Sequence, residues 1–126
     1  MRIRAYAHVM KRTSREEVFR LHARFCRALG DANRLLIIVA LQERPHTVNE
    51  LAKAIGASQS LTSRHLGLLR DKGLVVAHRE GAFMRYQLAD PRIFSAIEIL
   101  LDVLSAQLGP KVNRSAVARL RPARAS

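Results

Sequence analysis

Residues 58–75, SQSLTSRHLGLLRDKGLV, begin as a polar segment, continue as a leucine-spaced helix and end in Lys-Gly-Leu-Val. Thr62, Leu66 and Leu69 recur at helical spacing, so a helix places them on one face. Ser58 is a residue type that caps helix N-termini. The segment therefore predicts a helix that begins after Ser58 and packs through one face.

The opposite side of this helix presents polar groups. It carries short hydroxyls, an amide and a guanidinium: Gln59, Ser60, Ser63 and Arg64. Such groups bond to base edges and phosphates in the DNA major groove. A solvated helix face more often mixes Glu and Lys for i, i+4 pairing, and that pattern is absent here. We expect a DNA-reading face, with an ordinary exposed face as the alternative.

A short helix precedes this segment. Thr47 and Glu50 have the spacing of a capping box, and the helix that they begin stops at Gly56. Three residues, Gly-Ala-Ser, then connect it to the quoted helix. Two short helices joined in this way predict a helix-turn-helix.

Two further helices are predicted on the N-terminal side. Ser14 and Glu17 have capping-box spacing, and apolar residues then recur at helical intervals up to Gly30. Asp31 can cap a strongly apolar helix that ends before Pro45.

On the C-terminal side the periodicity changes from helical to alternating. LVVAHRE (74–80) and FMRYQL (83–88) predict two strands around a turn at Gly81, with Arg79 near the tip and Arg85 on the return strand. Asp90-Pro91 then begins a last helix that runs to Gly109. The fold class predicted is mainly α with a small β-hairpin, a winged helix-turn-helix.

The last helix has an apolar stripe that is wide for a lone surface helix. It consists of Ile93, Ile97, Leu100, Leu101, Leu104 and Leu108. Such a stripe is buried against the first helix or pairs with a second subunit, and we expect both. The protein is therefore expected to form a homodimer.

The net charge of +12 is concentrated at the two ends of this 126-residue chain. Residues 1–13 contribute +4 and residues 109–126 contribute +5, whereas residues 14–108 contribute +3. We expect one winged-helix domain over 14–108, a basic N-terminal arm (1–13) and a basic flexible C-terminal tail (109–126). Basic arms suggest a polyanion such as double-stranded DNA as partner, and the alternative is that they only aid solubility.

The sequence also predicts where the protein works. No apolar run approaches the roughly 20 residues needed to span a bilayer, so no membrane partner is expected. The N-terminus lacks the apolar core of a secretory signal, and Cys26 is the single cysteine, so no intrachain disulfide can form. A cytoplasmic location is expected.

Three segments together resemble the arsenic-repressor (ArsR/SmtB) family of bacterial winged-helix repressors, over roughly residues 15–107. They are FCRALGDANRLLIIVAL, TVNELAKAIGASQSLTSRHLGLLRDKGLV and REGAFMRYQLADP. The resemblance implies a homodimer joined through its first and last helices, which binds a palindromic operator and releases it when an effector binds.

The resemblance also implies which residues contact DNA. The family's base-reading positions fall on Gln59, Ser60, Ser63 and Arg64, with His65 beside them and partly packed. Thr62 is expected to pack. In the wing, Arg79 matches a basic contact to the DNA backbone or minor groove. The position after Gly81, often Arg or Lys in the family, is Ala82 here.

The resemblance leaves the small effector unknown. Metal-sensing members carry a Cys-x-Cys-type motif near the third helix, or a carboxylate with histidines on the last helix. Neither ERPHTVNELA nor residues 90–108 contain a cysteine, and residues 90–108 contain no histidine. We therefore expect no cofactor and neither of those metal sites. A sensor that forms an intramolecular bridge would need two cysteines.

His22 and Cys26 remain as a weak effector candidate, because four residues apart on a helix place them on one face. They could supply two of four zinc ligands across a dimer axis, or form a reactive thiol beside an imidazole. The favoured interpretation is that Cys26 packs in the core or dimer interface. The other histidines, His8, His46 and His78, share no ligand spacing and are expected at the surface.

Other functional classes fit less well. The phosphate-loop, zinc-protease and serine-hydrolase motifs are absent, so an enzyme is not expected. A sequence-indifferent architectural DNA-binding protein is the main alternative to a sequence-specific regulator, because the basic ends alone could coat DNA. A protein-interaction module would leave the polar face of residues 59–64 unexplained.

Overall fold

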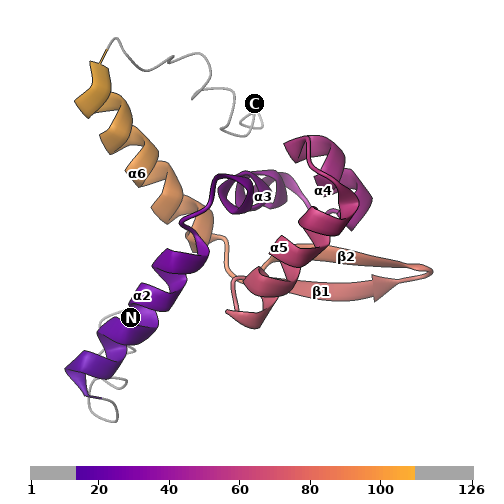
Figure 1. The fold of residues 1–126 in the computed structure, drawn as a ribbon, viewed down its shortest axis with the longest axis horizontal. Coiled ribbons are helices and arrows are strands. Elements are labelled where there is room, and N and C mark those ends of the chain that lie inside the picture. Colours follow the sequence, from indigo (N-terminus) through magenta and orange to yellow (C-terminus); the bar gives the residue numbers. More distant parts are fainter. Residues whose placement is uncertain (1–13, 110–126) are drawn as a thin grey trace.

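The computed structural model describes residues 14–109, and the predicted basic arm and tail lie outside the described residues except for Gly109. Figure 1 shows a small helical body from which a hairpin and two further helices project. The elements are α2 (Arg15–Ala28), α3 (Ala32–Glu43), α4 (Val48–Ile55), α5 (Gln59–Asp71), β1 (Val75–Glu80), β2 (Phe83–Leu88) and α6 (Arg92–Leu108). The predicted winged helix-turn-helix order is confirmed.

Local caps explain where the helices begin. The side chains of Ser14, Asp31 and Ser58 each accept a hydrogen bond from a backbone N–H three residues later, at 3.1 Å in all three cases. At α4 the capping box is complete, because Thr47 accepts from the Glu50 N–H and Glu50 accepts from the Thr47 N–H. At α2 the structure shows the serine half of the predicted box.

The core lies where α3, α4 and α5 meet the start of the hairpin. Its fully buried side chains are Ile37, Ile38, Leu51, Leu66, Leu69, Leu74 and Val75. Thr62 is also fully buried, and its hydroxyl donates to the Ser58 carbonyl at 2.8 Å. The prediction that Thr62 packs is confirmed.

The wing is an antiparallel hairpin in the register Val75↔Leu88 to Glu80↔Phe83. Gly81 has a φ of +63°, a left-handed value that favours glycine at the turn. The backbones of His46 and Tyr86 exchange two hydrogen bonds, of 3.0 and 2.8 Å, so the segment before α4 extends this sheet.

This pairing corrects the expected surface position of His46. The residue is 6% exposed, and its ring Nδ1 donates to the Arg44 carbonyl at 2.7 Å. The sequence offered no signal for this, because the bridge joins one residue to a strand 40 positions away. His78 is exposed, as expected.

Helices α2 and α6 are the least buried parts of the fold. They diverge from a common region near α3 and point away from each other (Figure 1). Ala28 is the buried residue of α2, and α6 contributes Phe94 and Ile97 to the core. Large apolar side chains remain exposed on both helices: Phe19, Leu21, Phe25, Ile99, Leu100, Val103, Leu104 and Leu108. The expectation that the last helix is buried against the first within one chain is therefore wrong.

Within residues 14–109, no helix combines the length and apolar content needed to cross a membrane.

Candidate nucleic-acid interface

The turn between α4 and α5 directs the polar face of α5 outward. Gly56 ends α4 with a φ of +68°, and Ser58 starts α5 two residues later. The buried residues of α5 are Thr62, His65, Leu66 and Leu69, whereas Gln59, Ser60, Ser63 and Arg64 are all exposed. Arg64 forms no hydrogen bond or ion pair with another residue of the 14–109 range, so its guanidinium is available to a ligand.

His65 does not belong to this exposed face, which corrects its inclusion with the DNA-contacting residues. It is 9% exposed, and its Nδ1 lies 3.3 Å from Nη1 of Arg34. Because a guanidinium only donates, Nδ1 is the acceptor and Nε2 carries the hydrogen. Nε2 lies 3.9 Å from Oδ1 of Asp31. His65 therefore joins α5 to the start of α3.

Arg34 connects three helices. Its Nε donates to the Ala28 carbonyl and its Nη2 to the Arg27 carbonyl at 3.4 Å, so it satisfies carbonyls in the last turn of α2. The Arg34 backbone N–H bonds to Asp31 and holds the pKa of that carboxyl below its usual value, helped by the positive charge of the Arg34 guanidinium. In the sequence, ALGDANR (28–34) indicates a helix cap at Asp31 and a family resemblance, but no local pattern indicates that Arg34 contacts α2 and α5.

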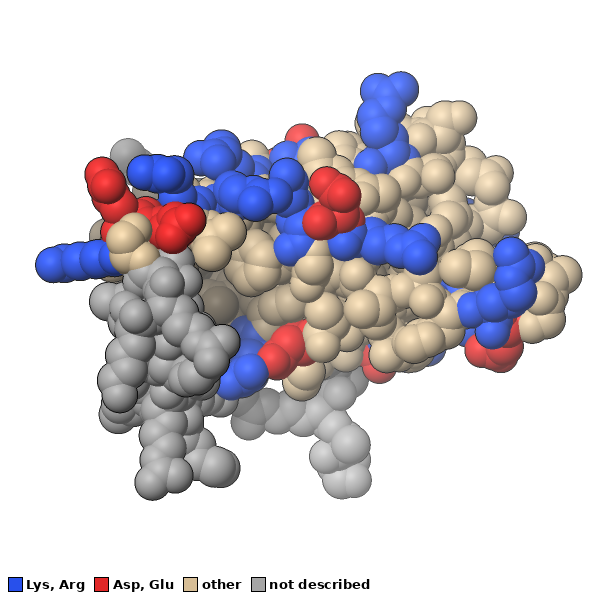
Figure 2. All heavy atoms as spheres, turned by 90° about the horizontal axis from the view of Figure 1, so that it is seen from below, with Lys and Arg blue, Asp and Glu red and all other residues tan. Residues whose placement is uncertain are grey.

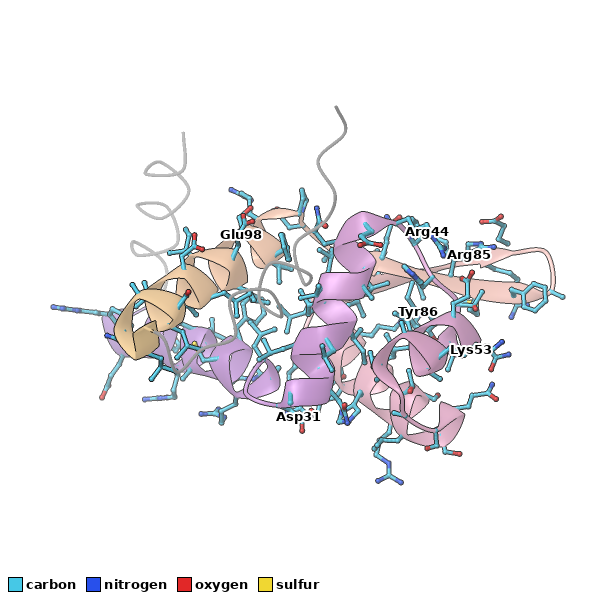
Figure 3. The ribbon with its side chains drawn as sticks, turned by 90° about the horizontal axis from the view of Figure 1, so that it is seen from above. Asp31, Arg44, Lys53, Arg85, Tyr86 and Glu98 are labelled. Atoms are coloured by element: carbon cyan, nitrogen blue, oxygen red, sulfur yellow. The ribbon has the colours of Figure 1, made fainter. Side chains whose placement is uncertain are left out.

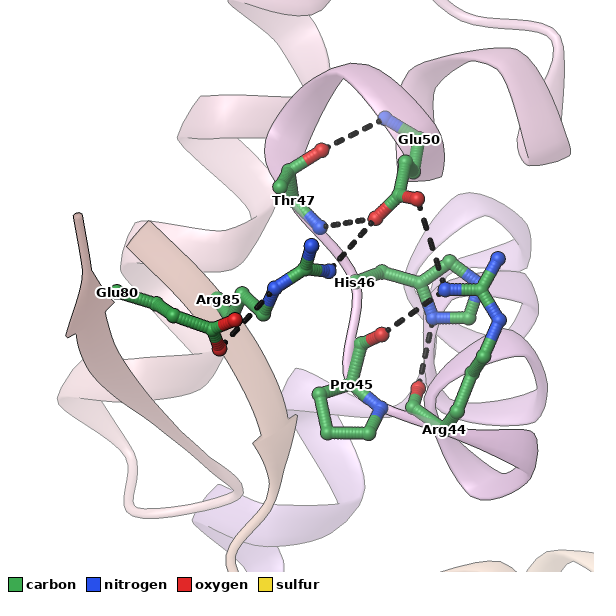
Figure 4. Close-up of polar contacts among 7 residues, drawn as sticks. All are labelled: Arg44, Pro45, His46, Thr47, Glu50, Glu80 and Arg85. Atoms are coloured by element: carbon green, nitrogen blue, oxygen red, sulfur yellow. Dashed lines mark hydrogen bonds and ion pairs between the residues drawn. The ribbon is translucent and has the colours of Figure 1, made fainter. Parts of the chain in front are cut away.

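A second polar cluster anchors the wing to α4 (Figure 4). The Glu50 carboxylate lies 3.3 Å from Nη1 of Arg85 and 3.5 Å from Nη1 of Arg44. Nε of Arg85 also lies 3.2 Å from the Glu80 carboxylate. Arg85 thus holds the hairpin in place. Arg79 lies near the end of β1, close to the tip of the hairpin, and is exposed.

Glu50 supports both α4 and the wing through its ionised form. The backbone N–H of Thr47 lowers the pKa of Glu50 below its usual 4.5, and the charges of Arg44 and Arg85 act in the same direction. A depressed folded-state pKa stabilises the fold above the unfolded pKa, and this stabilisation is lost as pH falls through the folded pKa.

We expect Glu50→Gln to melt at a lower temperature than the parent at pH 7, with a difference that shrinks below about pH 4.5. The effect should be small, because the Glu50 side chain is 38% exposed. Thermal melts between pH 3 and 7 measure it. Glu43→Gln, which removes the same charge from an exposed position at the end of α3, is the control. If the difference in melting temperature between Glu50→Gln and the parent widens as the pH falls, the stabilising role of ionised Glu50 is contradicted.

Several Lys and Arg side chains lie on the face of the molecule that Figure 2 shows, and Asp and Glu side chains lie among them. Lys53 on α4 is exposed and points outward, away from the core (Figure 3). Lys53 was not among the predicted DNA contacts, although its position in the first helix of a helix-turn-helix is a signal for one, because that helix crosses the DNA backbone.

His22 and Cys26 lie on the exposed surface of α2 in a single chain. Packing of Cys26 in the core of one subunit is therefore wrong, and packing between subunits stays a prediction. Among residues 14–109, no three His, Cys, Asp or Glu side chains are placed to hold a metal ion together.

The family model described as bacterial regulatory protein, arsR family, matches residues 31–76, from the start of α3 into β1. CmtR of Mycobacterium tuberculosis, a helix-turn-helix transcriptional regulator, is 43% identical over 84 residues, which cover 67% of this chain and 71% of CmtR. The chain belongs to the ArsR family.

Solved structures give the same result for the ArsR-family fold. The crystal structure of Rv0081 from M. tuberculosis has a TM-score of 0.68 and 34% identity, covering 75% of this chain and 95% of Rv0081. A homodimeric winged helix-turn-helix DNA-binding domain from Mycobacterium bovis, described as a possible ArsR-family regulator, has a TM-score of 0.67 and 29% identity, covering 75% and 92%. This ArsR-family chain is a DNA-binding transcriptional regulator, and the comparisons point to regulators rather than enzymes.

Proposed function

We propose that this regulator is a homodimeric repressor that binds a palindromic operator and is released by an effector. The observation that carries the proposal is the division of α5 into two sides. Thr62, Leu66 and Leu69 are fully buried, while the polar side chains of residues 59, 60, 63 and 64 are exposed. A helix held this firmly on one side can present base-reading groups in a fixed geometry.

The proposed DNA contacts divide by role. Gln59, Ser60, Ser63 and Arg64 enter the major groove and read base edges, because the N-terminal part of a recognition helix makes the base contacts. Arg79 in the wing and Lys53 on α4 bind phosphates or the minor groove, which adds affinity with little sequence preference. Ala82 contributes no charge at the wing tip.

A homodimer accounts for the apolar surfaces of α2 and α6. Leu100 is 67% exposed and Phe19 is 58% exposed in a single chain, and large apolar side chains that gather on an exposed helix face favour an interaction site there. A second copy that pairs these helices would bury both. A two-fold dimer would also match a palindromic operator.

The test of the proposed function is a titration of the full chain with its own promoter and with random DNA of equal length at one salt concentration. Preferential binding to the promoter is expected. Specific sites are typically bound 10³- to 10⁷-fold more tightly than random DNA, so the difference is readily measured by fluorescence anisotropy. Equal affinity for both DNAs would instead favour the architectural alternative.

Cys26 is the residue whose role bears most directly on the effector. The relative CmtR is described as a cadmium metal-sensor, but the described residues of this chain offer no cluster of three metal ligands. We propose that Cys26 packs between subunits, with a sensing role together with His22 as the alternative. We also propose that the protein acts in the cytoplasm.

We expect Cys26→Ser to bind operator with the parent's affinity, because the thiol lies on α2 and not on the proposed DNA-contacting elements α4, α5 and the wing. DNA release by hydrogen peroxide and by zinc is then measured for both proteins. An equal response in parent and variant supports packing. A response that the parent shows and Cys26→Ser lacks would assign sensing to Cys26 and contradict packing alone.

A further inference from the structure

A pocket of about 290 Å³ lies where the end of α2, the start of α3 and the C-terminal half of α5 meet. Its lining consists of Arg24, Arg27, Ala28, Arg34, Leu68 and Lys72. Four of these six residues are cations, and none carries a carboxylate. Like charges gathered around a cavity repel one another, and a bound anion would relieve that repulsion.

Two of the four cations of this pocket are uncompensated within the described part of the chain. Arg24 and Arg27 are exposed, and their side chains form no hydrogen bond or ion pair with another described residue. Lys72 has Asp71 beside it at 4.0 Å, but that carboxylate is 77% exposed. Positive charge therefore dominates the cavity.

The side chain of Arg34, which lines the pocket, is held by hydrogen bonds to its neighbours. A guanidinium has five N–H donors, and the bonds to Ala28, Arg27 and His65 hold it in place while leaving further N–H groups unused. A fixed guanidinium loses little entropy on binding and can meet an oxyanion with two parallel hydrogen bonds. Leu68, which is 37% exposed, supplies an apolar wall.

We propose that this pocket binds a small ligand that carries phosphate or carboxylate groups. Its volume accommodates on the order of ten water-sized groups, which suits a compact metabolite rather than a polymer. Arg34 holds one oxyanion, while Arg24, Arg27 and Lys72 neutralise it.

The position of the pocket favours a free anion over a phosphate of the bound DNA. Lys72 follows Arg64 by eight residues, so it lies about 12 Å further along α5 than the base-reading end. The pocket also joins α2, the proposed dimerisation helix, to the recognition helix. An anion bound in the pocket would therefore couple subunit pairing to operator affinity. This regulatory part of the proposal rests on the proposed function, whereas the binding of the anion does not.

The binding test uses calorimetric titration of the full chain with inorganic pyrophosphate and with citrate at constant ionic strength, without DNA. The parent should bind at least one of them saturably. The double variant Arg24→Ala/Arg27→Ala should bind that probe at least about tenfold more weakly than the parent, because two charge-assisted contacts are lost. Arg20→Ala is the matched control, since it removes an exposed α2 arginine that pairs with Glu16 and lies outside the pocket. Thermal melts confirm that all three proteins are folded.

Two results would overturn the binding proposal. One is no saturable binding by the parent, and the other is equal binding by the parent and the double variant. If the parent fails to bind either probe while the double variant loses operator affinity, the pocket holds a DNA phosphate instead.

A separate titration with operator DNA, with and without the probe that the parent binds, tests the regulatory part. We expect this probe to change the operator affinity of the parent and of Arg20→Ala more than that of the double variant. An equal change in all three would overturn the coupling. A parent that binds this probe but prefers no promoter would overturn the proposed function and leave the anion site standing.

Discussion

Leu104→Glu will give a monomer that binds operator weakly. Leu104 is 46% exposed on α6 in a single chain, so a charge there leaves the subunit core intact. In the proposed dimer the same carboxylate would be buried without a partner, which costs several kcal/mol. Dimerisation and operator binding should each weaken by about 100-fold or more. Sedimentation gives the subunit state, and fluorescence anisotropy gives the operator affinity.

Leu100→Glu should have the same effect, because Leu100 is also exposed on α6. Leu101 is a poorer probe, since it packs partly against the core and a charge there would disturb the fold as well. Ser95→Glu is the control, as it adds the same charge to an exposed position on the side of α6 that carries Asp102. A parent protein that is monomeric at micromolar concentration would rule out the dimer.

Arg64→Ala should lower the preference for operator over random DNA by about 1–3 kcal/mol, or roughly 5- to 150-fold. The exposed guanidinium is expected to meet a guanine edge, and its removal takes away base reading while most phosphate contacts remain. Gln59→Ala is a second probe on the same face. The measurement is the ratio of operator to random-DNA affinity at one fixed salt concentration.

Arg70→Ala is the matched control for this experiment, because it removes the same charge from an exposed position further along α5. Its effect should be similar on both DNAs, as expected for a general electrostatic contribution. If Arg64→Ala leaves the ratio unchanged, the assignment of α5 as the recognition helix fails.

Features that depend on neighbouring residues could be predicted from the sequence. Ser58 and Thr47 fix the starts of their helices through bonds to residues three positions away, and the alternation after Gly73 defines the hairpin. The exposed and buried sides of α5 follow from helical periodicity in the same way. These signals are local, so one sequence is enough to find them.

Features that depend on tertiary contacts could not be predicted. His65 has the spacing of a residue beside the exposed face, yet it contacts Arg34, 31 positions earlier in the chain. Arg85 looks like a free wing cation in sequence, and its partner Glu50 lies 35 positions away. Which polar side chain meets which depends on how the helices pack, and no local pattern encodes that.

The weak attachment of α2 links subunit association to folding itself. This 14-residue helix buries one residue, Ala28, and is tied to the body through the bonds that Arg34 makes to its last turn. Isolated helices of about this length are marginal in water. The folding of α2 and the pairing of subunits are then coupled in one equilibrium. The concentration of the protein in the cell would therefore set the fraction of it that is dimeric and able to bind its operator.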